Sequence, residues 1–429
     1  METVSHIQGQ AMLGELASAG ACGRSCTGPG GVAGESGNVA VARLARFLAT
    51  FRGTPDRLGA FLLSNGGRTG GLVPYVLQSY PLPCRIGDVR LFNAPLRRMR
   101  LLHEAGYWPD SPTACQALLS EIAETVRTGS ANGHGASVVD VVCATGVPVD
   151  SGLARALTTG GVPRQFRVYS PTPPVRHQRI LLPDSFEAYL AGLSPKSRAT
   201  LRRKVRKLLG EPASAGTSGG RTVQAASSDT RSNGIVRVTN QKDVPWLVAR
   251  MSQISRKTYQ YNLLGLGVRD AEQLVHDATV AAQRGWLRSY VLVLGGRAVA
   301  FMHGMQFPGP VSYNPGGGTY DYIDVGHDPD FSAQSPGTVL QYLVIQDLCG
   351  HNRPAVFDFG PGDAVHKERF ANESYLETDF YLFRSTSRAV WARSAHAACT
   401  RASAWVATAL DRVGLKSRVR RTVRRLASA

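Results

Sequence analysis

The order of apolar runs between residues 287 and 359 constrains the fold of this chain more than any other feature. The runs 287–294 and 298–307 flank Gly295-Gly296, and two apolar runs around a glycine pair are typical of a β-hairpin. A third strand, a helix and a fourth strand are predicted to follow at 319–325, 338–348 and 355–359. A helix that joins two neighbouring strands crosses over the sheet and makes them parallel. The sequence therefore predicts an α/β (α+β) fold with a mixed central sheet flanked by helices, and neither a doubly wound sheet nor an eightfold barrel.

Patterns on both sides of this region predict further elements. In the second half, strands are expected over 235–239 and 378–384, and helices over 193–209, 243–259, 270–284 and 363–370. The first half gives weaker signals: a helix over 114–126, a strand over 137–142 and shorter apolar runs at 72–77 and 89–92. Gly, Ala and Ser dominate 11–40 and 211–233, which predicts a disordered N-terminal tail over 1–40 and a mobile insert at 211–233.

The charge of the chain is concentrated in two segments. The 429 residues carry 49 Lys and Arg against 31 Asp and Glu, a formal net charge of +18. Residues 196–207 and 412–425 each hold seven bases and no acid, so the rest of the chain is close to neutral. Each segment also has an apolar stripe at helical spacing, so each is expected to bind an anionic partner such as a membrane surface or RNA. A solvated helix face and a frayed tail are the alternatives.

Several classes of protein are not expected. No apolar run reaches the ~20 residues of a membrane-spanning helix, and the N-terminus lacks the pattern of a secretory signal. The seven cysteines are scattered, and neither CxxC nor HExxH occurs, so we expect no metal site. A cytoplasmic protein is the expectation.

The first candidate site is Ser335-Pro336-Gly337-Thr338. Ser suits the N-cap of a helix, Pro suits its first turn, and Gly lets another group approach the backbone. The N–H groups at a helix N-terminus can bind a phosphate. The alternative is that the tetrapeptide only begins a helix.

The second candidate site is the sequence Asp358-Phe-Gly-Pro-Gly-Asp363, followed by His366 and Lys367. It joins a strand end to a helix start, a common place for a functional site. We expect Asp358 or Asp363 to act as a general base or to position substrate, with His366 and Lys367 as lesser catalytic candidates. A tight turn with Asp363 capping the next helix is the alternative. Tyr320, Tyr322 and Asp328 precede this sequence and are candidates for substrate contacts. For Tyr320 and Tyr322, which share one face of a strand, the alternatives are a proton donor and a packing role, and packing is favoured.

Four segments together resemble a known family. They are 254–260 (ISRKTYQ), 285–301, 325–340 and 357–370, and the basic segment 193–208 precedes them. Their order resembles the CelD-type or Fem-like acyltransferases of the GNAT superfamily, over about residues 181–384. Residues 62–77 resemble the strand pair of a degenerate first GNAT unit. The resemblance implies two tandem GNAT-like units: a degenerate unit at 41–180 and a catalytic unit at 181–384, followed by a basic helical tail at 385–429.

The resemblance also implies an activity. The family transfers an acyl group from a thioester, usually acetyl-CoA or another acyl-CoA, to an amine. The family context points to a small molecule or a cell-envelope or polysaccharide precursor as the acceptor. The superfamily holds the CoA pyrophosphate on amides at the start of the central helix, and this role falls on Ser335, Gly337 and Thr338. Two departures stand out: only Ser-Pro-Gly replaces the usual glycine-rich loop, and His366 stands where related sequences often have Tyr.

Two other functions remain open at this stage. The first is Fem-like transfer of an aminoacyl group from tRNA, with the basic helix binding RNA. The second is a non-catalytic protein that binds anionic lipid or nucleic acid through 196–207 and 412–425. The resemblance favours a protein of the cytoplasm, peripheral to the inner face of the membrane.

Overall fold

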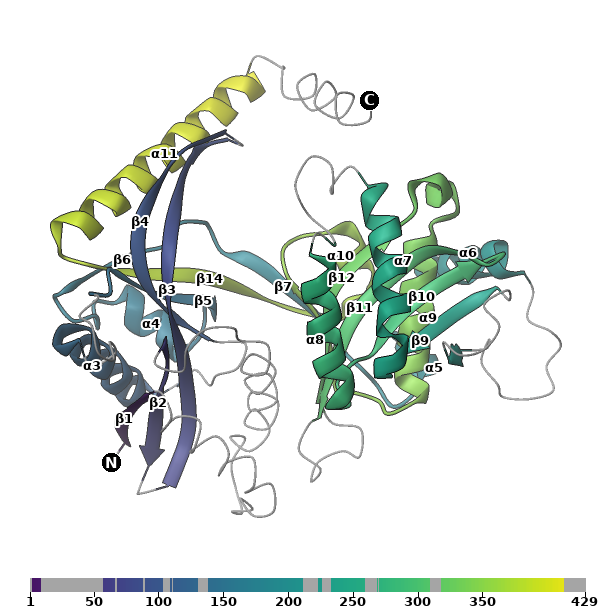
Figure 1. The fold of residues 1–429 in the computed structure, drawn as a ribbon, viewed down its shortest axis with the longest axis horizontal. Helices are drawn as coiled ribbons and strands as arrows, with labels where there is room; N and C mark the ends of the chain where they lie inside the picture. Colours follow the sequence, from purple (N-terminus) through teal and green to yellow (C-terminus); the bar gives the residue numbers. More distant parts are fainter. Residues whose placement is uncertain are drawn as a thin grey trace. The chain divides into compact units, whose positions relative to one another are not determined.

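A computed structural model describes most of the chain and divides it into two compact units. It describes residues 2–8, 57–65, 68–87, 89–102, 109, 111–129, 138–210, 223–225, 233–258, 268, 270–308 and 318–412. Unit 1 comprises Met1–Arg176 and Tyr375–Thr422, and unit 2 comprises His177–Ser374 and Val423–Ala429. Each unit has its own part of a mixed sheet with helices packed on it (Figure 1).

The described residues of unit 1 form seven strands, six in the order β1-β2-β3-β4-β5-β14 and β6, which pairs with β14 outside this order. The strands are β1 (Glu2–Gln8), β2 (Leu58–Asn65), β3 (Arg68–Ile86), β4 (Val89–Leu101), β5 (Val141–Pro148), β6 (Phe166–Tyr169) and β14 (Glu373–Arg384). Its helices are α3 (Pro112–Thr128), α4 (Gly152–Thr158) and α11 (Ser387–Arg412). Strands β4 and β5 are parallel and are joined by α3 as a crossover, whereas the other pairs are antiparallel.

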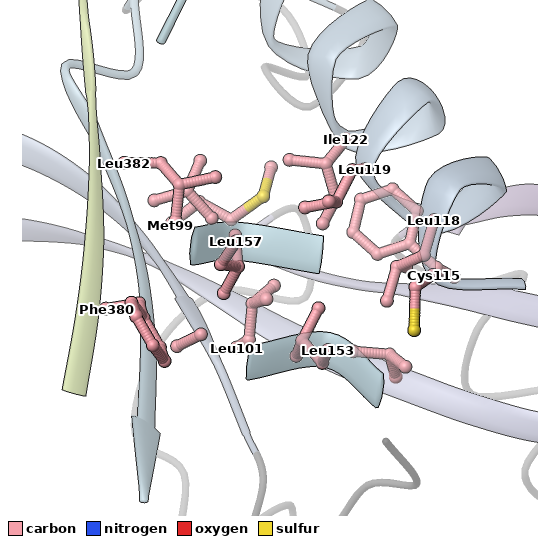
Figure 2. Close-up of a cluster of buried hydrophobic side chains, with 14 of the residues drawn as sticks. Met99, Leu101, Cys115, Leu118, Leu119, Ile122, Leu153, Leu157, Phe380 and Leu382 are labelled. Atoms are coloured by element: carbon pink, nitrogen blue, oxygen red, sulfur yellow. The ribbon is translucent and has the colours of Figure 1, made fainter. Parts of the chain in front are cut away.

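Two apolar clusters hold unit 1 together. In the first, α3 and α4 pack on the sheet, and Figure 2 shows side chains of both helices meeting Met99, Leu101, Phe380 and Leu382 from the strands. In the second, Ala389 and Ala392 of α11 are buried against strand residues of the β3–β4 hairpin, β5 and β14.

Unit 2 contains a seven-stranded sheet in the order β7-β13-β12-β11-β10-β9-β8. The strands are β7 (Val175–Leu181), β8 (Val223–Ala225), β9 (Gly234–Val238), β10 (Ser289–Leu294), β11 (Arg297–Pro308), β12 (Gly318–His327) and β13 (Val356–Pro361). The predicted hairpin is confirmed: β10 and β11 are antiparallel, and both turn glycines have positive φ, 56° at Gly295 and 78° at Gly296. That conformation is disfavoured for residues with a side chain, which explains the glycine pair.

Helices cover both faces of the unit 2 sheet. Helices α5 (Phe186–Gly192), α6 (Pro195–Leu209) and α9 (Pro336–Gly350) share one apolar cluster with the sheet. Helices α7 (Val244–Arg256) and α8 (Ala271–Gln283) are outside that cluster and pack on each other, and Figure 1 shows them in front of the strands. The crossover helix α9 makes β12 and β13 parallel, as predicted. A second parallel pair in this unit, β8 with β9, was not predicted.

The ends of the chain differ in part from the expectations. Disorder was expected over 1–40, but Glu2–Gln8 form strand β1, which pairs along its whole length with β2. Residues 11–40 and 413–429 lie outside the described residues, as does most of the expected mobile insert at 211–233. Within the insert, Val223–Ala225 form β8.

Strand membership crosses the predicted boundaries at 180 and 384. Residues His177–Leu181 of β7 belong to unit 2, where β7 pairs with β13. Residues Tyr375–Arg384 of β14 belong to unit 1, where β14 pairs with β5. Unit 1 is therefore completed by a strand that follows unit 2 in the sequence, whereas unit 2 begins four residues before the predicted boundary.

Candidate functional site

The candidate site begins where β12 and β13 part. The two strands pair over only three positions, ending with Asp321 opposite Asp358. Beyond that point β12 continues beside β11 to His327, whereas β13 continues beside β7 to Pro361. Among the described residues, the backbone groups of Tyr322–His327 on the β13 side therefore have no neighbouring strand.

The N-terminus of α9 lies at the end of β12. Ser335 has a left-handed backbone (φ 55°, ψ 51°), and its side chain does not cap the helix. The amides of Thr338 and Val339 both donate to the Ser335 carbonyl, at 3.1 and 3.2 Å. Pro336 has no N–H, and the Gly337 amide has no acceptor within the described part of the chain. Of the three predicted phosphate-binding residues, Gly337 is thus the one whose amide remains available.

In the corresponding crossover helix of unit 1, α3, a side chain caps the N-terminus. Helix α3 also begins with Ser-Pro, at Ser111-Pro112, but Ser111 is extended and its side chain accepts a hydrogen bond from the Ala114 amide at 3.1 Å. A capping side chain occupies the amide that a ligand would need. The same Ser-Pro dipeptide therefore begins both helices. Its serine side chain caps the helix N-terminus in unit 1 and leaves it uncapped in unit 2.

Tyr322 and His366 form a pair at the point where the strands part. Tyr322 is the first residue of β12 after the last paired position, and His366 lies in α10 (Val365–Phe370). The Tyr322 hydroxyl and His366 Nε2 are 3.0 Å apart. Partial burial of its imidazole and the neighbouring Lys367 lower the pKa of His366, although the residue as a whole is exposed, and burial raises the pKa of Tyr322. At neutral pH the pair therefore combines a neutral imidazole with a protonated hydroxyl.

Asp324 is a second titratable group on the unpaired part of β12. Burial raises its pKa from 3.8 to about 6, although a hydrogen bond from the Val325 backbone opposes the shift. It lies close enough to Tyr322 to raise the pKa of that hydroxyl further. A carboxylate with a pKa near neutrality is common in catalytic sites, but no sequence pattern singled it out.

Asp358 and Lys367 hold the Gly-Pro-Gly turn that follows β13. The Asp358 carboxylate accepts a hydrogen bond from the Gly360 amide at 2.7 Å and is 2.7 Å from His177 Nε2. The Lys367 ammonium donates to the carbonyls of Gly360 and Pro361, at 3.1 and 2.8 Å. These contacts make both side chains positioning groups for the turn that presents α10.

Asp363 and His177 also lie at this turn. Asp363 is exposed, and Ala364 occupies the N-cap of α10, so Asp363 does not cap the helix. His177 is nearly buried on β7 and was missed because it lies 181 positions before Asp358 in the sequence. No local spacing links residues that only a sheet brings together.

Two predicted substrate contacts have other roles in the structure. Tyr320 is fully buried and packs against Tyr290 and Phe357. Asp328 is 1% exposed and pairs with Lys257 at 2.8 Å and Arg297 at 2.6 Å. Burial opposes ionisation of Asp328, but the hydrogen bonds from these two cations lower its pKa below the usual value. We therefore propose no substrate contact for Tyr320 or Asp328.

The basic helix α6 lies beside the site. It contacts α9 and the 3-10 turn Pro329–Gln334 that leads into α9. Its buried Leu201 and Val205 face the core, as the apolar stripe predicted. Burial, Arg369 of α10 and the adjacent Arg203 lower the pKa of Lys204. Cations from α6 and α10 are thus gathered on the side of the sheet where α9 begins.

Comparisons with known proteins identify the second unit. The family model described as an acetyltransferase (GNAT) domain matches residues 195–368. No curated protein sequence matches the chain significantly. The predicted GNAT resemblance is confirmed for the residues that the family model covers.

Solved structures that resemble the chain are distant in sequence. FemX is 9% identical over 75% of this chain and 87% of that chain, with a TM-score of 0.46. A tandem GNAT protein from the clavulanic acid biosynthesis pathway is 13% identical over 90% of this chain and 99% of that chain, with a TM-score of 0.42. The C-terminal domain of a putative lysylphosphatidylglycerol synthetase from Agrobacterium fabrum is 12% identical over 82% and 90%, with a TM-score of 0.42. The assignment of residues 195–368 to a GNAT domain therefore rests on the family model and not on these structures. Residues 195–368 of the chain match the GNAT acetyltransferase domain family.

Proposed function

We propose that this protein is an acyltransferase that moves an acyl group from acyl-CoA to an amine. The observation that carries the proposal is the open N-terminus of α9 beside the parting strands, inside the domain that the GNAT family model matches. The Gly337 amide and the helix dipole would bind the pyrophosphate. The acyl-pantetheine arm would then lie along the free side of β12 and bring the thioester to Tyr322.

The Tyr322–His366 pair suits this reaction. In the tautomer with its hydrogen on Nε2, His366 donates to the Tyr322 hydroxyl, and Nδ1 is free to accept a proton from the attacking amine. The Tyr322 proton is then free to donate to the thioester oxygen as negative charge develops there. The amine forms the new amide bond, the C–S bond breaks, and CoA leaves as the thiolate. Asp358, His177 and Lys367 act as positioning residues, because they hold the turn that places His366.

Calorimetric binding of acetyl-CoA and a longer acyl-CoA to wild type and Gly337→Glu tests the proposal. A Cβ at Gly337 would have its nearest neighbour, His327 Nδ1, at 4.0 Å, so the substitution fits the folded protein. Its carboxylate would repel the pyrophosphate, and we expect it to abolish the binding that wild type shows. Gly337→Ala is the matched control and should bind nearly as wild type does. Absence of binding by folded wild type would contradict the proposal.

Transfer of an aminoacyl group from tRNA is the second candidate. It is favoured by the cations of α6 and by Arg369, which gather beside α9. In this case wild type would bind tRNA with strong salt dependence and would not bind acyl-CoA. Adding tRNA to the calorimetric series therefore separates the two candidates. The acceptor, including a cell-envelope or polysaccharide precursor, is to be found by an amine screen with the acyl donor that binds.

A further inference from the structure

Unit 1 exposes a group of large apolar side chains that the proposed transferase site does not use. We call it the tip surface, and its members are Val89, Leu91, Phe92, Trp391, Trp405 and Val406. Trp405 is 74% exposed, Val89 65%, Trp391 55% and Leu91 53%. Single exposed apolar residues are ordinary, but a group with two exposed tryptophans marks a surface that binds something.

Specific contacts hold the tip surface together. Helix α11 runs along the β3–β4 hairpin (Figure 1). The Arg388 guanidinium donates to the Pro95 carbonyl, and the rings of Phe92 and Trp391 are 5.9 Å apart. At the hairpin turn, Ser403 Oγ accepts from the Gly87 amide at 2.9 Å and donates to the Arg85 carbonyl at 3.1 Å. The hairpin turn is thus fixed beside the last turns of α11, where Trp405 and Val406 lie.

The two tryptophans project from one side of α11. They are fourteen positions apart, close to four helical turns, and exposed Ala398 lies midway between them. The inner side of the helix is occupied, because Ala389 and Ala392 are buried against the sheet. The outer side therefore presents indole rings with no covering element among the described residues.

Bases outnumber acids at the tip surface. The exposed Arg85 and Arg90 flank the hairpin turn, Asp88 follows Gly87 in the sequence, and α11 contains four arginines and one acid, Asp411. The sequence that follows α11, 413–425, adds six bases and no acid. Two copies of such a surface would repel each other. Tryptophan prefers the boundary between headgroups and hydrocarbon, and arginine binds lipid phosphates.

We propose that the tip surface docks on an anionic membrane, with Trp391 and Trp405 at the level of the lipid headgroups. No described helix is long and apolar enough to cross a membrane, so the docking is peripheral. The interaction combines apolar burial with electrostatic attraction, as in interfacial amphipathic helices. It goes beyond the proposed transferase reaction, because it involves unit 1 and none of the candidate site residues.

Vesicle flotation and tryptophan fluorescence of the full chain test this proposal. The vesicles are pure phosphatidylcholine and an equimolar mixture of phosphatidylcholine and phosphatidylglycerol. We expect binding to the mixed vesicles only, with a blue shift in emission that requires Trp391 and Trp405. Replacing both residues by Ser should weaken binding by roughly tenfold for each tryptophan removed. Val138→Ser is the matched control, because Val138 is 52% exposed in unit 1 but lies outside the tip surface.

Three results would overturn the proposal. One is failure of the wild-type protein to bind mixed vesicles. Another is equal binding by wild type and the double variant without an emission shift, since binding would then come from the basic C-terminal segment alone. The third is a dimer of wild type in sedimentation that the double variant loses, with no vesicle binding, which would make the tip surface an interface between copies. Circular dichroism melting of each variant separates loss of binding from loss of fold.

Discussion

At the scale of single residues, the Tyr322–His366 pair decides whether the proposed chemistry is right. His366 has a lowered pKa and therefore needs no deprotonation above neutral pH, and its partner Tyr322 keeps its proton. The sequence indicated both residues separately, but the 3.0 Å contact between them comes from the approach of α10 to β12.

We expect His366→Gln to lower kcat by about 10²–10⁴-fold, as loss of a general base does. In wild type, kcat/KM should rise with pH along an acid limb whose apparent pKa lies below 6.5, because only the neutral imidazole accepts a proton. That limb should vanish in His366→Gln. His276→Gln, on the exposed side of α8, is the control. An unchanged pH profile in His366→Gln would remove His366 from the mechanism.

The raised pKa of Asp324 leads us to expect that the free energy of unfolding depends on pH. Its pKa is about 6 in the folded protein and near 3.8 in the unfolded chain. A raised pKa stabilises the fold below about pH 4, and this contribution, about 3 kcal/mol, is lost as pH rises to about 6. In urea titrations, Asp324→Asn should therefore gain about 2–3 kcal/mol over wild type at pH 7.5 and little at pH 4. Asp184→Asn, at a side chain that is 94% exposed, is the control substitution. An equal gain for Asp324→Asn at both pH values would refute the burial argument.

At the scale of elements, the crossover helix α9 is anchored at its C-terminal end by a buried ion pair. Arg288 donates to the Asp347 carboxylate at 3.0 Å and to the carbonyls of His351 and Asn352 at 2.8 and 3.0 Å. Asp347 also accepts from the Tyr290 hydroxyl and from Arg237. The network ties the end of α9 to β10 and β9, so the opposite end, with Gly337, is held in place relative to the sheet.

Asp347→Leu should destabilise unit 2 by about 3–5 kcal/mol, because it leaves the buried Arg288 without its carboxylate. Urea denaturation followed by circular dichroism measures the loss. The control is Asp184→Ala, which removes the partner of Arg353 in a pair whose aspartate side chain is 94% exposed. A surface pair of this kind contributes little. Similar effects of the two substitutions would show that α9 does not depend on this network.

At the scale of the whole molecule, unit 1 is built from two separate parts of the sequence, because strand β14 returns to it after unit 2. Phe380 and Leu382 of β14 lie in the core of unit 1 (Figure 2), although unit 2 precedes them in the sequence. Likewise, Ile180 of β7 lies in the core of unit 2. A fragment that spans residues 181–384 therefore lacks Ile180 of the unit 2 core and contains Phe380 and Leu382 of the unit 1 core.

Two fragments of unit 2 should behave differently. Fragment 177–374 keeps His177 and Ile180 and ends before the apolar part of β14, so we expect a folded monomer by size-exclusion chromatography and circular dichroism. Fragment 181–384 loses the paired part of β7 and exposes the apolar side chains of β14, which favours aggregation. Identical behaviour of the two fragments would contradict the assignment of β7 to unit 2 and of β14 to unit 1.

The sequence by itself determined what depends on near neighbours in the chain. The Gly295-Gly296 turn, the helical stripes of α6 and α7 and the Ser-Pro start of α9 follow from residues a few positions apart, and so does the mixed sheet that one crossover helix implies. Only the tertiary structure decided which strands complete each unit, that His177 meets Asp358, and that Asp324 is buried enough to titrate near pH 6. It also decided that Ser335 leaves its helix open while Ser111 closes its own. The physical reason is that pairing and burial depend on residues distant in the sequence, whose approach leaves no periodic signal along the chain.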